Sequence, residues 1–322
     1  MKRAILFIIF YALFSTTLAA NPSYERMPAV KRFISHMHRK YAFDEAYLRK
    51  LFSKAVHQEE TLARYRGRRG KTDFSWHRYR SKILIPESVA MGRAFMKRKR
   101  KWLKKAQRLY GVSPEIVTAF IRVESKFGLY GGEYRVWDSL VTLAFNENRK
   151  RDYFRYELEK LLVLAARERL DILKLKGSFA GAMGAVQQMP SIQLKYAVDL
   201  DGDGVKNPGS IADSIGSIAN FLHDKGWRDD RRIVCRARYT AGASKTLKGG
   251  LRRLYEVKKL RKSGIVPVRC SIGSEKAYLI SLRDGGREEL YLGSRNYRII
   301  TLYNHSARYA VTIALYAEAL GY

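Results

Sequence analysis

The chain is short of acidic residues. Only 30 of its 322 residues are Asp or Glu, against 62 Lys and Arg, so the formal net charge is +32. Such an excess of positive charge predicts attraction to a polyanion. Apolar residues make up 46% of the chain and charged residues 29%, which is the composition of a globular protein. The chain is therefore expected to be mostly folded, as one large domain or two modest ones.

Long apolar runs are also scarce, and the one near the N-terminus is short. The run AILFIIFYALF covers only residues 4–14, too few for a stable membrane-spanning helix. Basic residues precede it and STTLAAN follows, which predicts a signal peptide over residues 1–20, cleaved after Ala19 or Ala20. No cysteine lies near this site, which excludes a lipid anchor on a new N-terminal cysteine. We therefore expect an exported or periplasmic, soluble protein with no transmembrane anchor after cleavage.

Export narrows the choice of polyanion. Nucleic acid is the first candidate inside a cell, and the signal peptide argues against it. Outside the inner membrane, the available polyanions are cell-wall polymers, lipopolysaccharide and anionic lipid surfaces. The run KRKRK, residues 97–101, is interpreted as a solvated helix face near a wall polymer, not as a localisation signal. The expected partner is thus an anionic cell-wall surface, with no nucleic acid.

Cysteine is nearly absent. The chain has only Cys235 and Cys270, and in an exported protein two cysteines can form one disulfide. Closing that loop would contribute roughly 3–4 kcal/mol to stability. The alternative is two separate buried thiols; the disulfide is the favoured interpretation.

Helix-type segments dominate, and strand-type segments occur late in the chain. The runs RIVCRARYT, KAYLISL, EELYLG and YRIITLY, separated by glycine-containing turns, are interpreted as short strands. There are no internal repeats. The expected organisation is a signal peptide (1–20), an N-terminal helical region (21–95), a helical core (96–231), a small β-containing subdomain (232–302) and a C-terminal helix returning to the core (303–322).

The segment GVSPEIVTAFIRVESKFG, residues 111–128, has clear helix punctuation. Ser113 is a good N-cap residue, and Pro114 fits the first helical position. Gly128 can end the helix. This helix contains one acidic residue, Glu124, at a position where its helical periodicity predicts an apolar environment.

Glu124 is expected on the dry face of that helix. At helical spacing it shares a face with Val117, Phe120, Ile121 and Phe127, whereas Arg122, Ser125 and Lys126 fall on the other side. Desolvation on an apolar face raises the pKa of a carboxyl group, which suits a catalytic acid. A buried ion pair with an arginine and an exposed helix end are the alternatives, and periodicity alone favours them. Most glycosidases also need a second carboxylate, and neither Glu133 nor Asp138 has a diagnostic spacing.

The segment DLDGDGVKNPGSIAD, residues 199–213, has the spacing of a calcium loop. Carboxylates occupy loop positions 1, 3 and 5, a glycine follows at position 6, and the next carbonyl lies at position 7. Position 12 is Ser210 rather than Glu, so a later aspartate would have to replace the missing ligand. The alternative is a polar turn with no metal. The expected site holds structural Ca²⁺, with no organic cofactor, through Asp199, Asp201, Asp203, Val205 and Asp213.

Several of these motifs, in this order, resemble the B-type lytic murein transglycosylases. The matching strings are VESKFG, LVTLAFNENRKRDYF, LKGSFAGAMGAVQQMPS, YAVDLDGDGVKNP and IGSIANFLHDKGW, and FSWHRYRSKILIP and ITLYNHSARYA also look like family segments. The resemblance runs from about residue 30 to the end of the chain. It implies a mainly α (α+β) fold: a lysozyme-like helical core with an N-terminal helical domain, an EF-hand-like calcium loop and a small late β-containing subdomain.

The resemblance also implies a reaction and a set of site residues. The enzyme would cleave the β-1,4 bond between N-acetylmuramic acid and N-acetylglucosamine in peptidoglycan glycan strands. The muramyl C6 hydroxyl, not water, would attack the anomeric carbon and leave a 1,6-anhydro end, so that no second carboxylate is needed. Glu124 matches the single catalytic acid and base. Matching positions make Tyr79, Ser178, Gln187 and Tyr303 the groups that orient or contact the sugars, and the calcium ligands match through Asp213.

The chain departs from the usual family pattern at four positions. Phe127 stands where the family usually has Trp, and Phe221 where members often have Tyr. Val186 and Gln188 replace the usual Gly and Phe, which predicts a different groove wall near Gln187.

Two other functions fit parts of the sequence. One is a muramidase-type hydrolase with the same site, in which water attacks instead of the C6 hydroxyl. The other is a non-catalytic, cationic, calcium-stabilised wall-binding protein, against which the intact motifs around Glu124 speak.

Overall fold

The computed structural model describes residues 23–66, 75–229, 232–284 and 286–322. The predicted signal peptide lies outside these residues. The chain divides into two compact units, residues 1–57 and 58–322, and each is described by itself. Within the described residues, no helix combines the length and the apolar character that crossing a membrane requires.

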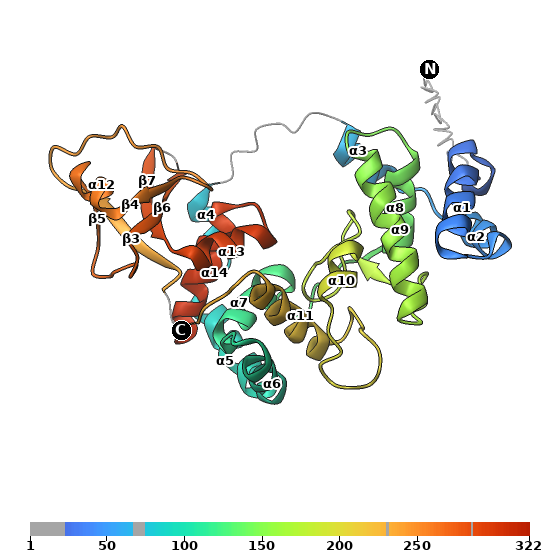
Figure 1. The fold of residues 1–322 in the computed structure, drawn as a ribbon, viewed down its shortest axis with the longest axis horizontal. Coiled ribbons are helices and arrows are strands. Elements are labelled where there is room, and N and C mark those ends of the chain that lie inside the picture. The colour runs from blue at the N-terminus through green and yellow to red at the C-terminus, as the bar shows by residue number, and fades with distance from the viewer. Residues whose placement is uncertain (1–22, 67–74, 230–231, 285) are drawn as a thin grey trace, which may run out of the picture. The chain divides into compact units, whose positions relative to one another are not determined.

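The described residues of the first unit form a short 3₁₀ helix and two α-helices, α1 and α2, which Figure 1 labels. The helix α2 begins after Asp44, whose carboxylate accepts a hydrogen bond from the Tyr47 amide at 2.5 Å. Phe33 of α1 meets Phe52 of α2 edge to face, with ring centroids 6.0 Å apart. The bounds are η1 (Tyr24–Arg26), α1 (Pro28–Tyr41) and α2 (Glu45–Ser53).

The second unit is mainly helical. Its helices are α3 (Glu59–Arg66), α4 (Trp76–Ser81), α5 (Pro86–Arg98), α6 (Arg100–Tyr110), α7 (Pro114–Ser125), α8 (Val136–Phe145), α9 (Arg151–Arg167), α10 (Pro190–Tyr196), α11 (Ile211–Asp224), α12 (Val257–Lys262), α13 (Arg295–Tyr303) and α14 (Ala307–Leu320). The helix α7 contacts α5, α6, α11 and α14 (Figure 1), and it is therefore central to this part of the core.

Because α7 is surrounded, it is buried on nearly all sides. Arg122 and Ser125, which we expected on a solvated face, are only 7% and 2% exposed. The Arg122 guanidinium donates to the Ser88 hydroxyl at 2.5 Å and to the Lys82 carbonyl at 3.1 Å, which offsets the cost of burying it. The expectation that α7 has one apolar and one solvated side was wrong. Helical periodicity assumes that a helix lies on the protein surface, whereas α7 is enclosed by other helices.

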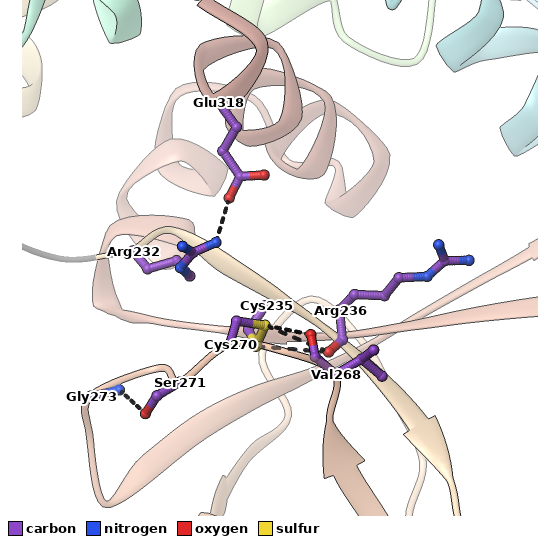
Figure 2. The surroundings of a disulfide bond; sticks show 8 residues. All are labelled: Arg232, Cys235, Arg236, Val268, Cys270, Ser271, Gly273 and Glu318. Atoms are coloured by element: carbon purple, nitrogen blue, oxygen red, sulfur yellow. Dashed lines mark hydrogen bonds and ion pairs between the residues drawn. A yellow bond between two sulfur atoms is a disulfide. The ribbon is translucent and has the colours of Figure 1, made fainter. Parts of the chain in front are cut away.

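The late β-containing part is a five-stranded antiparallel sheet with strand order β4-β6-β7-β3-β5. Its strands are β3 (Val234–Tyr239), β4 (Leu254–Glu256), β5 (Ile265–Pro267), β6 (Lys276–Asp284) and β7 (Arg287–Gly293). A disulfide joins Cys235 and Cys270, with Cα atoms 5.9 Å apart, and Figure 2 shows it beside Arg236 and Val268. The same view shows Arg232 paired with Glu318 of α14 at 3.2 Å, a contact that ties the start of β3 to the C-terminal helix.

One predicted strand is a helix. The run YRIITLY forms α13, whose side chains Asn296, Tyr297, Ile299, Ile300 and Thr301 are buried. Ser294 caps this helix by accepting a hydrogen bond from the Asn296 amide at 3.1 Å. Tyrosine and isoleucine favour strands as isolated residues, but packing of a helical face against the core decides the conformation here.

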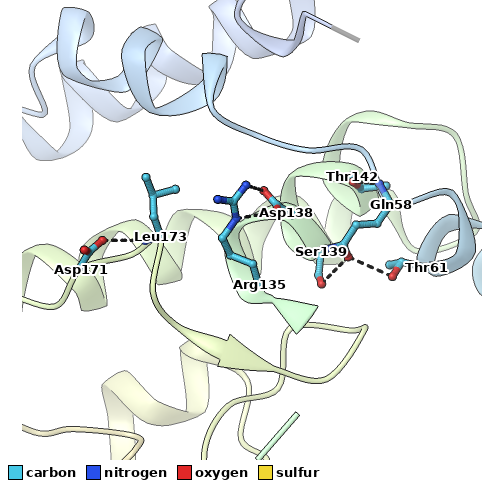
Figure 3. Close-up of polar contacts among 8 residues, drawn as sticks. All are labelled: Gln58, Thr61, Arg135, Asp138, Ser139, Thr142, Asp171 and Leu173. Atoms are coloured by element: carbon cyan, nitrogen blue, oxygen red, sulfur yellow. Dashed lines mark hydrogen bonds and ion pairs between the residues drawn. The ribbon is translucent and has the colours of Figure 1, made fainter. Parts of the chain in front are cut away.

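A short two-stranded sheet ends at Gly177, where the glycine-rich segment 177–189 begins. Strands β1 (Tyr134–Arg135) and β2 (Lys176–Gly177) pair so that Tyr134 lies opposite Gly177. Arg135 donates to both oxygens of Asp138 at 2.6 and 2.8 Å, which fixes the start of α8 (Figure 3). The same view shows Gln58 accepting hydrogen bonds from Thr61 and Ser139, so that the beginning of α3 is tied to α8.

Candidate active site

Glu124 lies in the last turn of α7. The helix ends at Ser125, and three successive residues, Lys126, Phe127 and Gly128, then adopt positive φ angles of 47°, 66° and 86°. The chain therefore turns sharply away directly after the glutamate. At the other end, Ser113 occupies the predicted N-cap position, but its side chain makes no capping hydrogen bond.

The Glu124 carboxyl is desolvated and has a tyrosine as its hydrogen-bond partner. The Tyr309 hydroxyl of α14 donates to Glu124 Oε1 at 2.5 Å. Burial raises the pKa of Glu124 to about 7, and the hydrogen bond from Tyr309 opposes this shift. The acid is thus half protonated near neutral pH, as proton transfer at that pH requires.

Two of the predicted sugar-contacting residues lie beside this acid. Burial, followed by the negative charge of Glu124, raises the pKa of Tyr79 to about 12. The same two causes raise the pKa of Tyr303 well above its usual value. The rings of Tyr303 and Tyr309 lie parallel, with centroids 6.4 Å apart, and each meets Phe120 of α7 edge to face. Glu124 is therefore surrounded by tyrosines that come from α4, α13 and α14.

The other two predicted residues lie in the glycine-rich segment 177–189. The Ser178 hydroxyl accepts hydrogen bonds from the backbone amides of Ala180 and Ala182 at 3.3 and 3.1 Å. The Gln187 side-chain amide donates to the carbonyls of Gly131 and Gly184 at 2.8 and 2.9 Å. Both residues are partly exposed, but their hydrogen bonds organise this segment and do not reach Glu124.

Short contacts join this segment to α7. The Ser125 hydroxyl donates to the Ala185 carbonyl at 2.7 Å and accepts from the Gly128 amide at 2.9 Å. The Tyr303 hydroxyl donates to the Val186 carbonyl. These hydrogen bonds hold three parts of the chain together around Glu124: the end of α7, the helix α13, and the segment 177–189.

The departures from the usual pattern are all buried. Phe127 stacks on Phe95, with ring centroids 5.3 Å apart, and Phe221 meets Tyr303 edge to face at 5.1 Å. Val186 is fully buried and Gln188 is 3% exposed. These four residues therefore shape the layer behind the site.

Sequence reasoning missed Tyr309 and the joining role of Ser125. Tyr309 lies 185 residues from Glu124 in the chain, so no local pattern connects the two. In the sequence, Tyr309 was indicated only by its position in the family-like segment ITLYNHSARYA. In the structure, Ser306 of this segment caps α14 by accepting a hydrogen bond from the Tyr309 amide at 3.2 Å.

The predicted metal loop brings three carboxylates together. Oxygens of Asp199, Asp201 and Asp213 all lie within 4.8 Å of one another. Burial raises the pKa of Asp213, and the nearby charges of Asp201 and Asp199 raise it further. Such mutual repulsion fits a hard cation with oxygen ligands. Asp203 is outside this group, and its carboxylate accepts a hydrogen bond from the Val205 amide at 2.8 Å.

The metal loop packs against both parts of the site. A Cβ atom on Gly184 would lie 2.0 Å from the Pro208 carbonyl oxygen, so that only glycine fits between the loop and the segment 177–189. A Cβ atom on Gly128 would lie 2.6 Å from the Ile211 side chain. The loop therefore supports the turn after Glu124 and the segment facing it.

The arrangement around Glu124 contains one acid rather than a carboxylate pair. Among the described residues, no second carboxylate contributes to the raised pKa of Glu124. A buried acid with a pKa near neutrality can both donate and accept a proton. The helical core, the lone acid and the acidic loop together define a lysozyme-like lytic transglycosylase.

Comparison with known proteins agrees with this class. Residues 25–318 match the transglycosylase SLT domain family. The chain is 35% identical over 301 residues to the membrane-bound lytic murein transglycosylase B of Escherichia coli (strain K12), covering 91% of this chain and 82% of the relative. It therefore belongs to this family of lytic murein transglycosylases, which are enzymes acting on peptidoglycan.

Two solved structures are also similar over most of the chain. The E. coli lytic transglycosylase Slt35 in complex with calcium has 35% sequence identity and a TM-score of 0.82, and 94% of each chain is covered. SltB3 from Pseudomonas aeruginosa in complex with NAG-NAM-pentapeptide has 25% identity and a TM-score of 0.79, covering 91% of this chain and 80% of that one. The predicted lysozyme-like fold and the transglycosylase activity are thus confirmed.

Proposed function

We propose that Glu124 performs both proton transfers of a lytic transglycosylase reaction on the bond between N-acetylmuramic acid and N-acetylglucosamine. The protonated carboxyl donates its proton to the glycosidic oxygen as the bond from that oxygen to the muramyl C1 breaks. The resulting carboxylate accepts the proton of the muramyl C6 hydroxyl, and that oxygen attacks C1. The products are a free N-acetylglucosamine hydroxyl and a 1,6-anhydromuramyl end, and no water is consumed.

The observation that carries this proposal is the raised pKa of Glu124, at about 7. An ordinary glutamate is ionised at neutral pH and has no proton to give, whereas this one retains a proton on a substantial fraction of molecules. The hydrogen bond from Tyr309 holds Oε1, which leaves Oε2 to carry the proton. The absence of a second carboxylate acting on Glu124, among the described residues, favours an internal nucleophile over the two-carboxylate mechanisms.

The neighbouring groups would orient the sugars. Tyr79 and Tyr303 lie beside the acid, and both hydroxyls are protonated at neutral pH. The Tyr303 hydroxyl already donates to the Val186 carbonyl, so it would act towards a sugar as an acceptor. Ser178 and Gln187 are partly exposed on the segment facing α7, where they would contact the glycan strand.

A structural Ca²⁺ would be held by Asp199, Asp201 and Asp213, with Asp203 and the Val205 carbonyl completing the ligands. The grouped carboxylates support the first three assignments. When bound, the ion would neutralise repulsion in the loop that packs on Gly128 and Gly184. Its role is therefore to hold the site in shape.

The expected setting is the periplasm or another exported location, where peptidoglycan strands and the anionic wall surface are the partners. The net charge of +32 supports attraction to such a surface, and the reaction would serve remodelling or turnover of the wall.

Product analysis tests the proposal. Purified peptidoglycan digested by the wild-type protein should yield muramyl products lighter by one water than those of a hydrolase, and Glu124→Gln should yield none. Reducing ends instead of anhydro ends would establish the muramidase alternative. Digestion that survives Glu124→Gln would overturn the acid assignment, and a wild-type protein that binds peptidoglycan without cutting it would favour the non-catalytic alternative.

A further inference from the structure

The helices α5 and α6 carry an unbalanced charge. Residues 88–110 contain no Asp or Glu. Within the described residues, none of the cations of this segment forms an ion pair. The cations are Arg93, Lys97, Arg98, Lys99, Arg100, Lys101, Lys104, Lys105 and Arg108.

On α6 these cations share one side. At 3.6 residues per turn, its five cations occupy an arc of about 140°. Leu103 and Ala106 lie on the opposite side and are buried, 1% and 0% exposed, in the core that also contains α7 and α11. Four of the five cations are exposed, and we call them the α6 cationic face: Arg100, Lys101, Lys104 and Arg108.

Helix stability does not explain these residues. Arg100 and Lys101 lie in the first turn of α6, where the helix dipole disfavours positive charge, and no acidic residue accompanies them there. Arg100 and Lys104 are spaced i, i+4, as are Lys104 and Arg108, and like charges at this spacing repel each other. The helix dipole favours Arg108 in the last turn, but helix stability does not account for Arg100, Lys101 and Lys104, whereas binding to a negatively charged partner would.

The edge of this face indicates the chemistry of the partner. Leu109 is 55% exposed, and Trp102 is partly buried beneath two lysine side chains, with Lys101 Nζ 4.3 Å and Lys105 Nζ 5.9 Å from the ring centroid. Around the axis of α6, Leu109 and Trp102 lie next to each other, directly beside the arc of cations. Cations bordered by tryptophan and an exposed aliphatic residue suit the headgroup layer of an anionic bilayer. Binding to a wall polymer that carries carboxylates would require only the cations, and not Trp102 or Leu109.

We propose that the α6 cationic face binds an anionic phospholipid surface and holds the enzyme there. The apolar side of α6 is committed to the core, so the helix docks on the headgroups without inserting. No residue of the candidate active site comes from α6, so docking and catalysis use separate parts of the chain. This inference does not depend on the proton-transfer roles of Glu124.

The test uses the chain from Asn21 onward, the exported form that the leader predicts, with the α6 variant in which Arg100, Lys101, Lys104 and Arg108 are all changed to Gln. Lys105 is retained because its ammonium donates to the Leu200 carbonyl at 2.7 Å in the metal loop. Sedimentation with vesicles of phosphatidylglycerol and phosphatidylcholine is compared with pure phosphatidylcholine. A cation near an anionic surface contributes roughly fivefold to binding, so the variant should bind at least about tenfold more weakly.

A second variant distinguishes an effect of the α6 cationic face from an effect of the total charge of the protein. Lys258, Lys259, Arg261 and Lys262 of α12 are exposed, and changing them to Gln removes the same four charges. We expect this α12 variant to bind anionic vesicles as the wild type does, and all binding to weaken near 1 M salt, where charges are screened over about 3 Å. All three proteins should cut isolated glycan strands at the same rate.

Three outcomes would overturn the proposal. The first is a wild-type protein that does not bind anionic vesicles, and the second is an equal loss of binding in the α6 and α12 variants. The third is an α6 variant that binds vesicles normally but loses binding to purified sacculi, which would assign the face to wall carboxylates. Loss of vesicle binding in the α6 variant alone, with glycan cleavage intact, supports the lipid assignment.

Discussion

Replacing Glu124 by Gln should stabilise the protein at high pH while abolishing its activity. Burial raises the pKa of Glu124 from 4.5 to about 7, so the folded protein holds this proton more tightly than the unfolded chain does. The stability associated with that proton is fully present below pH 4.5 and is lost as the pH rises through about 7. Above that pH, folding requires burial of a carboxylate, and glutamine avoids this cost.

The size of the effect follows from the shift. The rise in the pKa from 4.5 to about 7 corresponds to roughly 3 kcal/mol, which is the upper limit of the destabilisation above pH 7. Glutamine matches the protonated acid in size and charge, so the variant and the wild type should be equally stable near pH 4. At pH 8 the variant should be more stable by roughly 2–3 kcal/mol, since the residue is partly exposed and water relieves some of the cost.

Denaturant unfolding at pH 4, 6 and 8 measures this difference. The matched control is Glu147→Gln, which removes one carboxylate at an exposed position between α8 and α9. The reasoning is refuted if the stability difference between Glu124→Gln and wild type is the same at pH 4 and pH 8, or if the control reproduces the pH dependence. Activity gives an independent check, because kcat/KM of the wild type should fall as the pH rises above about 7.

Three further predictions concern the surroundings of the acid. Tyr309→Phe removes the hydrogen bond that opposes the raised pKa of Glu124, so the basic limb of the pH–rate profile should move to higher pH; an unmoved limb would show that this bond does not act on the acid. Chelation should lower the unfolding temperature and the activity of the wild type, and added Ca²⁺ should restore both, whereas Asp213→Asn should respond to neither treatment. Gly184→Ala should cost at least about 2 kcal/mol and slow glycan cleavage, because its φ is +69° and its Cβ would meet the Pro208 carbonyl; wild-type stability would contradict the proposed packing of the metal loop against the site.

The sequence predicted those parts of the fold whose signals are local. The start of α7 follows from Ser113 with Pro114, and the pairing of Cys235 with Cys270 follows from there being no other cysteine. Strand-type runs between turn residues likewise located β3, β6 and β7, whereas β4 and β5 were not predicted. The residues that determine each helix or strand lie within a few positions of it in the sequence, and the two cysteines have no other cysteine with which to pair.

The errors and omissions arise where distant packing decides. The strand-type residues of YRIITLY form α13 because Tyr297 and Ile300 fit the core only on a helix. The partner of Glu124 is Tyr309, which no pattern within α7 could reveal. The expected solvated side of α7 was wrong for the same reason, since α5, α6, α11 and α14 all contact this helix.

The enclosure of α7 gives a physical criterion for separating its structural polar groups from its functional one. Arg122 is buried with two hydrogen-bond acceptors, and the Ser125 hydroxyl donates to the Ala185 carbonyl and accepts from the Gly128 amide. Both residues are satisfied within the protein, and their hydrogen bonds hold the helix in place. Glu124 receives one hydrogen bond, from Tyr309, and keeps a raised pKa. A desolvated acid that no basic residue of the described part of the chain neutralises costs stability at neutral pH. That cost is consistent with a proton held available for the substrate.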